Sequence, residues 1–171
     1  MKILSRGKYY LTPFTAYHIE EVVKNLSEEN KRELSFLGHT DVEQAIIEMY
    51  ESSECYIARK EGGPFLMVGG LWHDDDQEFP QMFSMFSKDF AEHFTAIARG
   101  SRMLVNFFDK TQAMLSMTIL SDYQFMVQWA TWLGFEPVGI TESNSHKYVE
   151  FVRCNPNQKG VYDSASRPVM H

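Results

Sequence analysis

The run His73-Asp74-Asp75-Asp76 places an imidazole beside three carboxylates, which are groups that bind divalent metal ions. Side chains of consecutive residues rarely converge on one ion, and the sequence contains no Asp-x-Asp-x-Asp-Gly calcium loop. We therefore predict no metal site here. The run is expected to form a solvent-exposed acidic loop.

The two cysteines are the next candidates for chemistry. Cys55 and Cys154 fall in different predicted strands, and neither has a nearby histidine in the sequence that would favour a reactive thiolate. Two cysteines are also too few for a disulfide framework. We expect both to be buried thiols without a catalytic role.

Composition limits the class of protein. The 171 residues are 44% hydrophobic and 14% aromatic, enough for one domain with one substantial core. The net charge is -7 and the 16 Lys and Arg residues are scattered, so direct nucleic-acid binding is not expected. The sequence has no apolar run of membrane-spanning length and no signal-peptide pattern at its start, which predicts synthesis in the cytoplasm.

Hydrophobic periodicity predicts the elements that must position any site. Strands are expected over residues 9–15, 54–60, 65–72, 82–87, 114–120, 136–142 and 146–153. Helices are expected over residues 19–37, with a break at Ser27, and over 42–49, 89–108 and 123–133. Chain order is therefore strand, two helices, three strands, helix, strand, helix and two strands.

Polar residues mark where three of these helices should begin. Thr40 with Glu43 matches a capping box for the helix over 42–49. Asp89 is expected to be the N-cap of the helix that follows it, and Ser121 or Asp122 the N-cap of the last helix.

The sequence Leu133-Gly134-Phe135-Glu136-Pro137 predicts a helix that ends and passes directly into a strand. Gly134 suits the left-handed conformation at a helix C-terminus, and Phe135 suits the apolar contact that accompanies such a cap. These residues resemble the last helix-to-strand junction of the GCN5-related N-acetyltransferase (GNAT) superfamily, whose enzymes use acyl-CoA. The predicted order of elements also matches that of the superfamily over residues 9–153.

This resemblance implies a single α/β domain over residues 1–153. Its central sheet should be mixed but mostly antiparallel, with six to seven strands and about four helices. Residues 154–171 should follow as an extended tail. Two prolines and a few apolar residues give this tail the pattern of a peptide that docks on a neighbouring surface.

The resemblance also implies where acetyl-CoA would bind. GNAT enzymes hold the pyrophosphate on backbone amides of a glycine-containing loop at a helix N-terminus. This chain has no glycine between residues 71 and 99, and Asp89 brings negative charge to the corresponding segment. If acetyl-CoA binds, the resemblance assigns its contacts to Met85, Phe86, Ser87 and Lys88.

Catalytic residues follow from the same resemblance. The family's tyrosine acid lies four residues before the glycine, where this chain has Ala130, and Tyr123 stands where the family often has asparagine. Tyr123 is therefore the candidate acid, although a half-buried tyrosine at a helix start more often packs with a satisfied hydroxyl. A general base could come from Glu54, His73 or Asp74 through a water molecule.

A narrower resemblance concerns residues 24–34 with Gly38, and residues 114–135. These segments are similar to a family of bacteriophage GNAT-like proteins, which in fold and size resemble internal virion protein A of short-tailed phages. The resemblance implies a virion or assembly component without a cofactor, made in the host cytoplasm and later carried in the virion. The tail over 154–171 would contact other phage structural proteins.

Two alternatives remain at the level of sequence. The first is an acetyl-CoA-dependent N-acetyltransferase acting on a host protein. The second is a host-directed binding protein without catalysis. The strand over residues 82–87 bears on this choice because it has Met and Phe on both faces, and the second face would either fill the acyl-CoA cleft or bind a partner.

Overall fold

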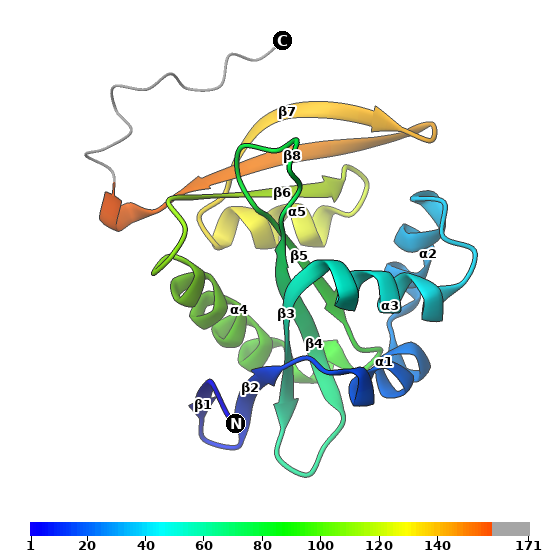
Figure 1. Cartoon of the computed structure of the whole chain (residues 1–171), viewed down its shortest axis with the longest axis vertical. Helices are drawn as coiled ribbons and strands as arrows, with labels where there is room; N and C mark the ends of the chain where they lie inside the picture. The colour runs from blue at the N-terminus through cyan, green and yellow to red at the C-terminus, as the bar shows by residue number, and fades with distance from the viewer. Residues whose placement is uncertain (159–171) are drawn as a thin grey trace.

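The computed structural model describes residues 1–158, which form an α/β fold around one eight-stranded sheet (Figure 1). The strands are β1 Leu4–Arg6, β2 Tyr9–Pro13, β3 Ser53–Lys60, β4 Phe65–Trp72, β5 Gln81–Phe86, β6 Met114–Leu120, β7 Glu136–Ser143 and β8 His146–Cys154. The α-helices are α1 Ile19–Asn25, α2 Glu28–Phe36, α3 Val42–Ser52, α4 Phe94–Phe108 and α5 Gln124–Trp132. Short 3-10 helices lie at Ala16–His18 (η1), Phe90–His93 (η2) and Pro156–Gln158 (η3).

The predicted fold class is confirmed, with slightly more elements than expected. The described residues contain eight strands and five α-helices, against the predicted six to seven strands and about four helices. The additional strand, β1, pairs with β2 after a turn at Gly7, whose φ of 61° suits glycine. Three residues are too short for a periodic hydrophobic signal, so the sequence analysis missed β1.

The sheet has the order β1-β2-β3-β4-β5-β6-β8-β7. Its neighbouring strands are antiparallel except β5 and β6, which are parallel. These two strands are paired only at Gln81 with Ser116, near the start of each strand, so they diverge beyond that point.

The helices cover both faces of the sheet. Adjacent residues of β3 point to opposite faces, and Tyr56 belongs to one buried cluster while Ile57 belongs to the other. Side chains of α4 and α5 pack in the first cluster, and side chains of α1 and α3 pack in the second. The core therefore has two layers, one on each side of the sheet.

The helix-to-strand junction at Gly134 is confirmed. Gly134 has a φ of 91°, its N–H donates to Thr131 O at 3.0 Å, and the Phe135 N–H donates to Ala130 O at 3.0 Å. These two bonds form a Schellman motif. Phe135 is 2% exposed and packs in the first cluster, as expected of the apolar residue that follows such a cap.

The predicted helix starts need correction. Asp41 caps α3 in place of the Thr40–Glu43 box, because its carboxylate accepts the N–H groups of Glu43 and Gln44 at 2.9 and 3.3 Å. Asp89 stands at the N-cap position of η2, but its side chain makes no capping bond there.

At the start of α5 the N-cap residue is Tyr123, so neither Ser121 nor Asp122 caps this helix. The two predicted buried thiols also differ from each other. Cys55 is buried, and burial raises the pKa of its thiol to about 11, whereas Cys154 is exposed at the end of β8. The prediction for Cys154 was wrong because its side chain points to the exposed side of the strand, opposite to those of the buried Arg153 and Asn155.

Asn155, just after β8, packs against the domain, whereas residues 154 and 156–158 are exposed. Asn155 is 3% exposed, and its amide nitrogen donates to Asp109 O at 2.6 Å. Most of the predicted tail, residues 159–171, lies outside the described residues.

Candidate functional site

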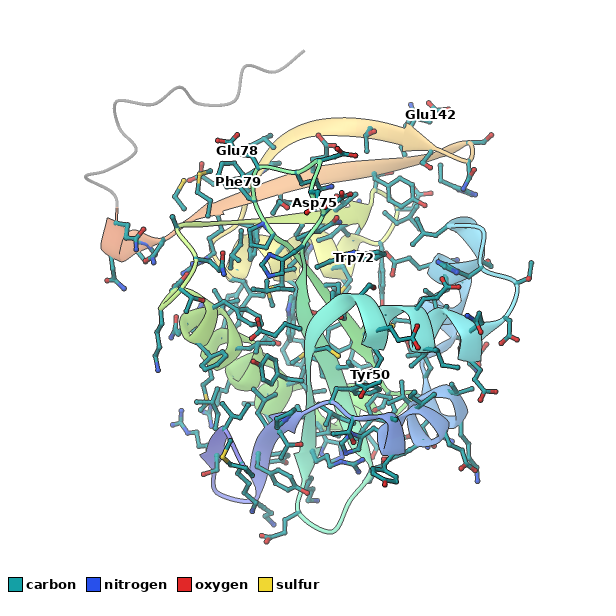
Figure 2. All side chains as sticks on the ribbon, viewed as in Figure 1. Tyr50, Trp72, Asp75, Glu78, Phe79 and Glu142 are labelled. Carbon is teal, nitrogen blue, oxygen red and sulfur yellow. The ribbon has the colours of Figure 1, made fainter. Side chains whose placement is uncertain are left out.

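A cavity of about 430 Å³ opens where β5 and β6 diverge, on the face of the sheet that carries α2 and α3. Trp72, at the end of β4, lies above α3 in the view of Figure 2 and is 47% exposed. Titratable side chains from α2, α3 and the loop between them line the cavity together with apolar residues of both strands. These lining residues include Asn30, Glu33, His39, Glu48, Ser84, Met85, Met117 and Thr118.

Asn30 holds the inner wall of this cavity in place. Its side-chain oxygen accepts the Phe86 N–H at 2.8 Å and the Ser27 hydroxyl at 2.9 Å, and its amide nitrogen donates to Glu33 at 3.4 Å. Burial raises the pKa of Glu33 above its ordinary value, and the bond from Asn30 and the charge of Arg32 offset only part of that rise. Glu33 is therefore a carboxyl group at the cavity whose pKa is raised by burial.

Two tyrosines lie within electrostatic reach of Glu33. Tyr123 is half-buried, and its pKa is raised to about 12, first by burial and then by Glu29 and Glu33. Tyr148 of β8 is buried, its pKa is raised by burial and by Glu33, and its hydroxyl has no hydrogen-bond partner within residues 1–158. Neither tyrosine is among the described residues that line the cavity, so their connection to Glu33 is electrostatic.

Of these three residues only Tyr123 was predicted from the sequence, and Glu33 and Tyr148 were not. Glu33 is one of several carboxylates on α2, and only its contact with Asn30 and its burial against the sheet distinguish it. The three predicted bases lie elsewhere. Glu54 accepts a hydrogen bond from the Tyr56 hydroxyl, and His73 and Asp74 are exposed.

The acidic run forms the expected exposed loop between β4 and β5. Figure 2 shows Asp75 and Glu78 on this loop. Within residues 1–158, no group of three or more His, Cys, Asp or Glu side chains is placed to hold a metal ion. None of the helices in the same part of the chain has the length and apolar content of a membrane span.

The backbone amides predicted to contact acetyl-CoA already have partners in the protein. The Phe86 N–H donates to Asn30, the Ser87 N–H to Leu66 O at 3.0 Å, and the Lys88 N–H to Asn25 O at 2.8 Å. The Ser87 hydroxyl is buried without a partner among the described residues, and the Lys88 side chain is exposed. At this end of the site, Lys88 is the predicted contact whose polar side chain reaches solvent.

Aromatic rings fill the space between the end of β5, η2 and α5. Phe90 lies 5.6 Å from both Phe86 and Phe125, measured between ring centroids, and Phe94 lies 5.7 Å from Trp129. Phe125 and Trp129 are themselves 5.6 Å apart. We call these five residues the aromatic cluster. Phe86 thus packs against helix residues on one face of β5, whereas Phe83 and Met85 on the other face line the cavity.

The residues therefore fit one end of the acetyl-CoA site that the GNAT fold implies and not the other. The reacting end has a cavity lined by the Glu33 carboxyl group, whose charge also acts on the phenols of Tyr123 and Tyr148 outside the lining. The phosphate end lacks free backbone amides at residues 86–88, and the aromatic cluster packs beside it.

The chain matches no family model and no curated protein. It does resemble solved structures of acetyltransferases. A protein from Bordetella pertussis described as a member of the GnaT acetyltransferase family has a TM-score of 0.71 and 12% identity, over 90% of this chain and 100% of that one.

Two further structures give the same result. The N-acetyltransferase from Staphylococcus aureus Mu50 has a TM-score of 0.65 and 11% identity, over 87% of this chain and 99% of that one. The spermidine N-acetyltransferase from Vibrio cholerae, solved with CoA and spermine, has a TM-score of 0.64 and 8% identity, over 88% of this chain and 97% of that one. The chain thus has the fold of the GNAT acetyltransferases.

Proposed function

We propose that this protein is an N-acetyltransferase whose amine substrate enters the cavity between β5 and β6. The observation that carries this proposal is the half-buried Glu33 carboxyl at that cavity, with its raised pKa and its influence on both Tyr123 and Tyr148. The likeness to solved acetyltransferases supports the same function. An amine of a host protein is one acceptor that this chemistry suits.

The residues of this site suit the two proton transfers of acetylation. An amine attacks an acyl group only when neutral, so a base must remove its proton. Glu33, once ionised, takes that proton directly or through one water molecule. Tyr123, with a pKa of about 12, keeps its proton at neutral pH and donates it to the leaving group. Acetyl-CoA would supply the activated acetyl group.

The phosphate end of the site limits how tightly acetyl-CoA binds. Of the four predicted contacts, Met85 and Phe86 are buried, Ser87 has a buried hydroxyl, and Lys88 alone extends an exposed charge that suits phosphate. We expect affinity to be weak, since the usual amide cradle is replaced by one flexible ammonium group.

Calorimetry with acetyl-CoA and a thiol-release assay with a panel of primary amines test this proposal. Glu33→Gln should lower kcat by roughly 100-fold or more, the loss expected when a general base is removed. Glu51→Gln, which changes an exposed carboxylate at the end of α3, should leave kcat unchanged. Turnover that is insensitive to Glu33→Gln, or an absence of acetyl-CoA binding, contradicts the proposal.

A non-catalytic assembly component of a phage virion is the second candidate. The paired amides of residues 86–88 and the aromatic cluster favour it, because both occupy the place where an acyl-CoA enzyme needs free groups. In this case the protein, made in the host cytoplasm, enters the virion through contacts of the predicted tail with other phage structural proteins.

Deletion of residues 159–171 tests the second candidate and retains the buried Asn155. The truncated protein should keep its melting temperature and lose its incorporation into particles. If the truncated protein enters particles at the normal level, residues 159–171 are not needed for attachment and the second candidate loses its proposed contact.

A further inference from the structure

A second cavity, of about 440 Å³, lies under the hairpin formed by β1 and β2, on the face of the sheet that carries α4. It is lined by residues of both hairpin strands and the turn between them, by α4, and by residues of β3 and β4. The candidate amine cavity lies against α2 and α3, so the two cavities occupy opposite faces of the sheet. The GNAT-like site described above does not include this hairpin cavity.

The floor of the hairpin cavity is apolar. Leu11, Leu66, Met67 and Ile97 contribute to it, and each is 4% exposed or less. Gly100 of α4 faces the same space, and a Cβ atom placed there would meet no atom within 4 Å apart from its chain neighbours and the backbone of its own helix. A helix interior normally disfavours glycine by about 1 kcal/mol relative to alanine. Glycine at this position leaves space in the cavity that a side chain would occupy.

The rim of the hairpin cavity is cationic. Arg6, Lys8 and Arg99 are exposed lining residues, and none of them forms an ion pair within residues 1–158. A fourth lining cation, Arg59, is already paired with Glu21. Among residues 1–158, no Asp or Glu lines the cavity, although the whole chain has a net charge of -7.

Glu61, in the turn between β3 and β4, contacts the backbone of the hairpin but is not a lining residue of the cavity. The Glu61 N–H donates to Lys8 O at 2.7 Å, but the Glu61 carboxylate lies 4.0 Å from Lys2 Nζ, outside the lining residues. Hydroxyl groups of Ser5, Tyr9 and Thr95 add hydrogen-bond partners among the lining residues. An apolar floor below unpaired cations is complementary to a molecule with an alkyl part and one negative charge.

We propose that the hairpin cavity binds a small amphiphilic anion, a single-chain alkyl carboxylate, with its chain on the apolar floor and its carboxylate between Arg6, Lys8 and Arg99. Arginine suits this role because its planar guanidinium pairs with both oxygens of a carboxylate. The proposal is independent of acetyl transfer, since it uses other residues on the other face of the sheet.

Calorimetric titration of the full chain with decanoate, below its micelle concentration, tests the proposal. Decanoate should bind with one site per chain, and decylammonium, with the same chain and the opposite charge, at least about tenfold more weakly, as expected for loss of charge-assisted contacts. Equal binding of the two probes, or no binding of decanoate, overturns the proposal.

Variants locate the site. Gly100→Leu fills the cavity and should abolish decanoate binding, whereas Asn106→Leu adds the same side chain to an exposed position of α4 and should not change it. Arg99→Gln should weaken binding about three- to tenfold, and Lys24→Gln, an exposed cation on α1, should have no effect. Retained binding in Gly100→Leu at an unchanged melting temperature places decanoate elsewhere and overturns the proposal.

Vesicles separate a free carboxylate from a membrane lipid as the source of the anion. Decanoate should bind without vesicles, and vesicles of phosphatidylcholine with anionic phosphatidylglycerol should not retain the protein in sedimentation. Retention on these vesicles without binding of free decanoate overturns the cavity proposal in favour of a membrane surface.

Discussion

Phe90→Ala is expected to weaken folding and strengthen acetyl-CoA binding at the same time. Phe90 belongs to the aromatic cluster and has two ring neighbours, Phe86 and Phe125, each at 5.6 Å. Ring pairs of this kind contribute about 0.5–1.5 kcal/mol each beyond their buried area. Full burial of a phenylalanine makes its replacement by alanine cost about 3–5 kcal/mol, and Phe90 is only partly buried, so we expect a loss of about 2–3 kcal/mol.

The effect on binding follows from the same contacts. If acetyl-CoA must displace the Phe90 ring, the free energy of the broken ring contacts opposes binding. Phe90→Ala has no such contacts to break, so it should bind acetyl-CoA more tightly. A change of about 1.4 kcal/mol is a tenfold change in Kd, so we expect acetyl-CoA to bind Phe90→Ala about tenfold more tightly than the wild type.

Urea denaturation and calorimetry measure the two effects separately. Phe107→Ala is the matched control, because Phe107 is also partly buried and has ring neighbours, Tyr56 and Phe108, at 5.6 and 5.8 Å. It should lose similar stability without any gain in affinity. Unchanged or weaker acetyl-CoA binding in Phe90→Ala would refute the idea that the aromatic cluster obstructs the cleft.

Three further predictions concern stability and pH. Leu133→Ala should cost about 2–5 kcal/mol in thermal melts because Leu133 is 5% exposed, whereas Trp132→Ala should cost less because Trp132 is 45% exposed. Asp109→Ala should cost about 3–5 kcal/mol in urea, since it leaves the buried Arg153 guanidinium without its ion-pair partner. A raised pKa in the folded state means that the ionised Glu33 carboxyl destabilises folding, so the stability of Glu33→Gln relative to wild type should increase as pH rises through the carboxyl range. If the free energies of unfolding of Glu33→Gln and wild type differ by the same amount across that pH range, the raised pKa of Glu33 is contradicted.

Much of the fold was predictable because periodic patterns and end signals agree along the chain. The bounds of β4 and β6 were predicted to the residue, and the Gly134 junction was predicted with its conformation. Local rules succeed there because each element is long enough to repeat its pattern, and glycine at a helix end has one common use. The Asp41 cap shows the limit, since Asp41 and Thr40 are both good caps and only the backbone path selects between them.

The candidate site was less predictable because its members meet only after folding. Glu33 and Tyr123 lie far apart in sequence, and the charge of Glu33 acts on Tyr123 only in the folded chain. The partner of the Phe86 amide, Asn30, lies 56 residues away and gives no sequence signal of that contact. Burial of a carboxyl group, which shifts its pKa, is likewise a property of the assembled protein.

Because β5 and β6 share a single backbone pairing, the sheet consists of two parts, β1 to β5 and β6 to β8, and side-chain contacts connect them. On one face the aromatic cluster links β5 and η2 to α5. On the other, the tip of the β7–β8 hairpin reaches α2, where Asn144 Nδ2 donates to Phe36 O at 3.0 Å and the Phe36 and His146 rings stack at 3.8 Å. Backbone ladders unite the strands within each part, so the cooperativity of unfolding between the parts depends on these side-chain contacts. A substitution that weakens either contact should allow the two parts to unfold separately. The candidate amine cavity lies at the boundary between these parts.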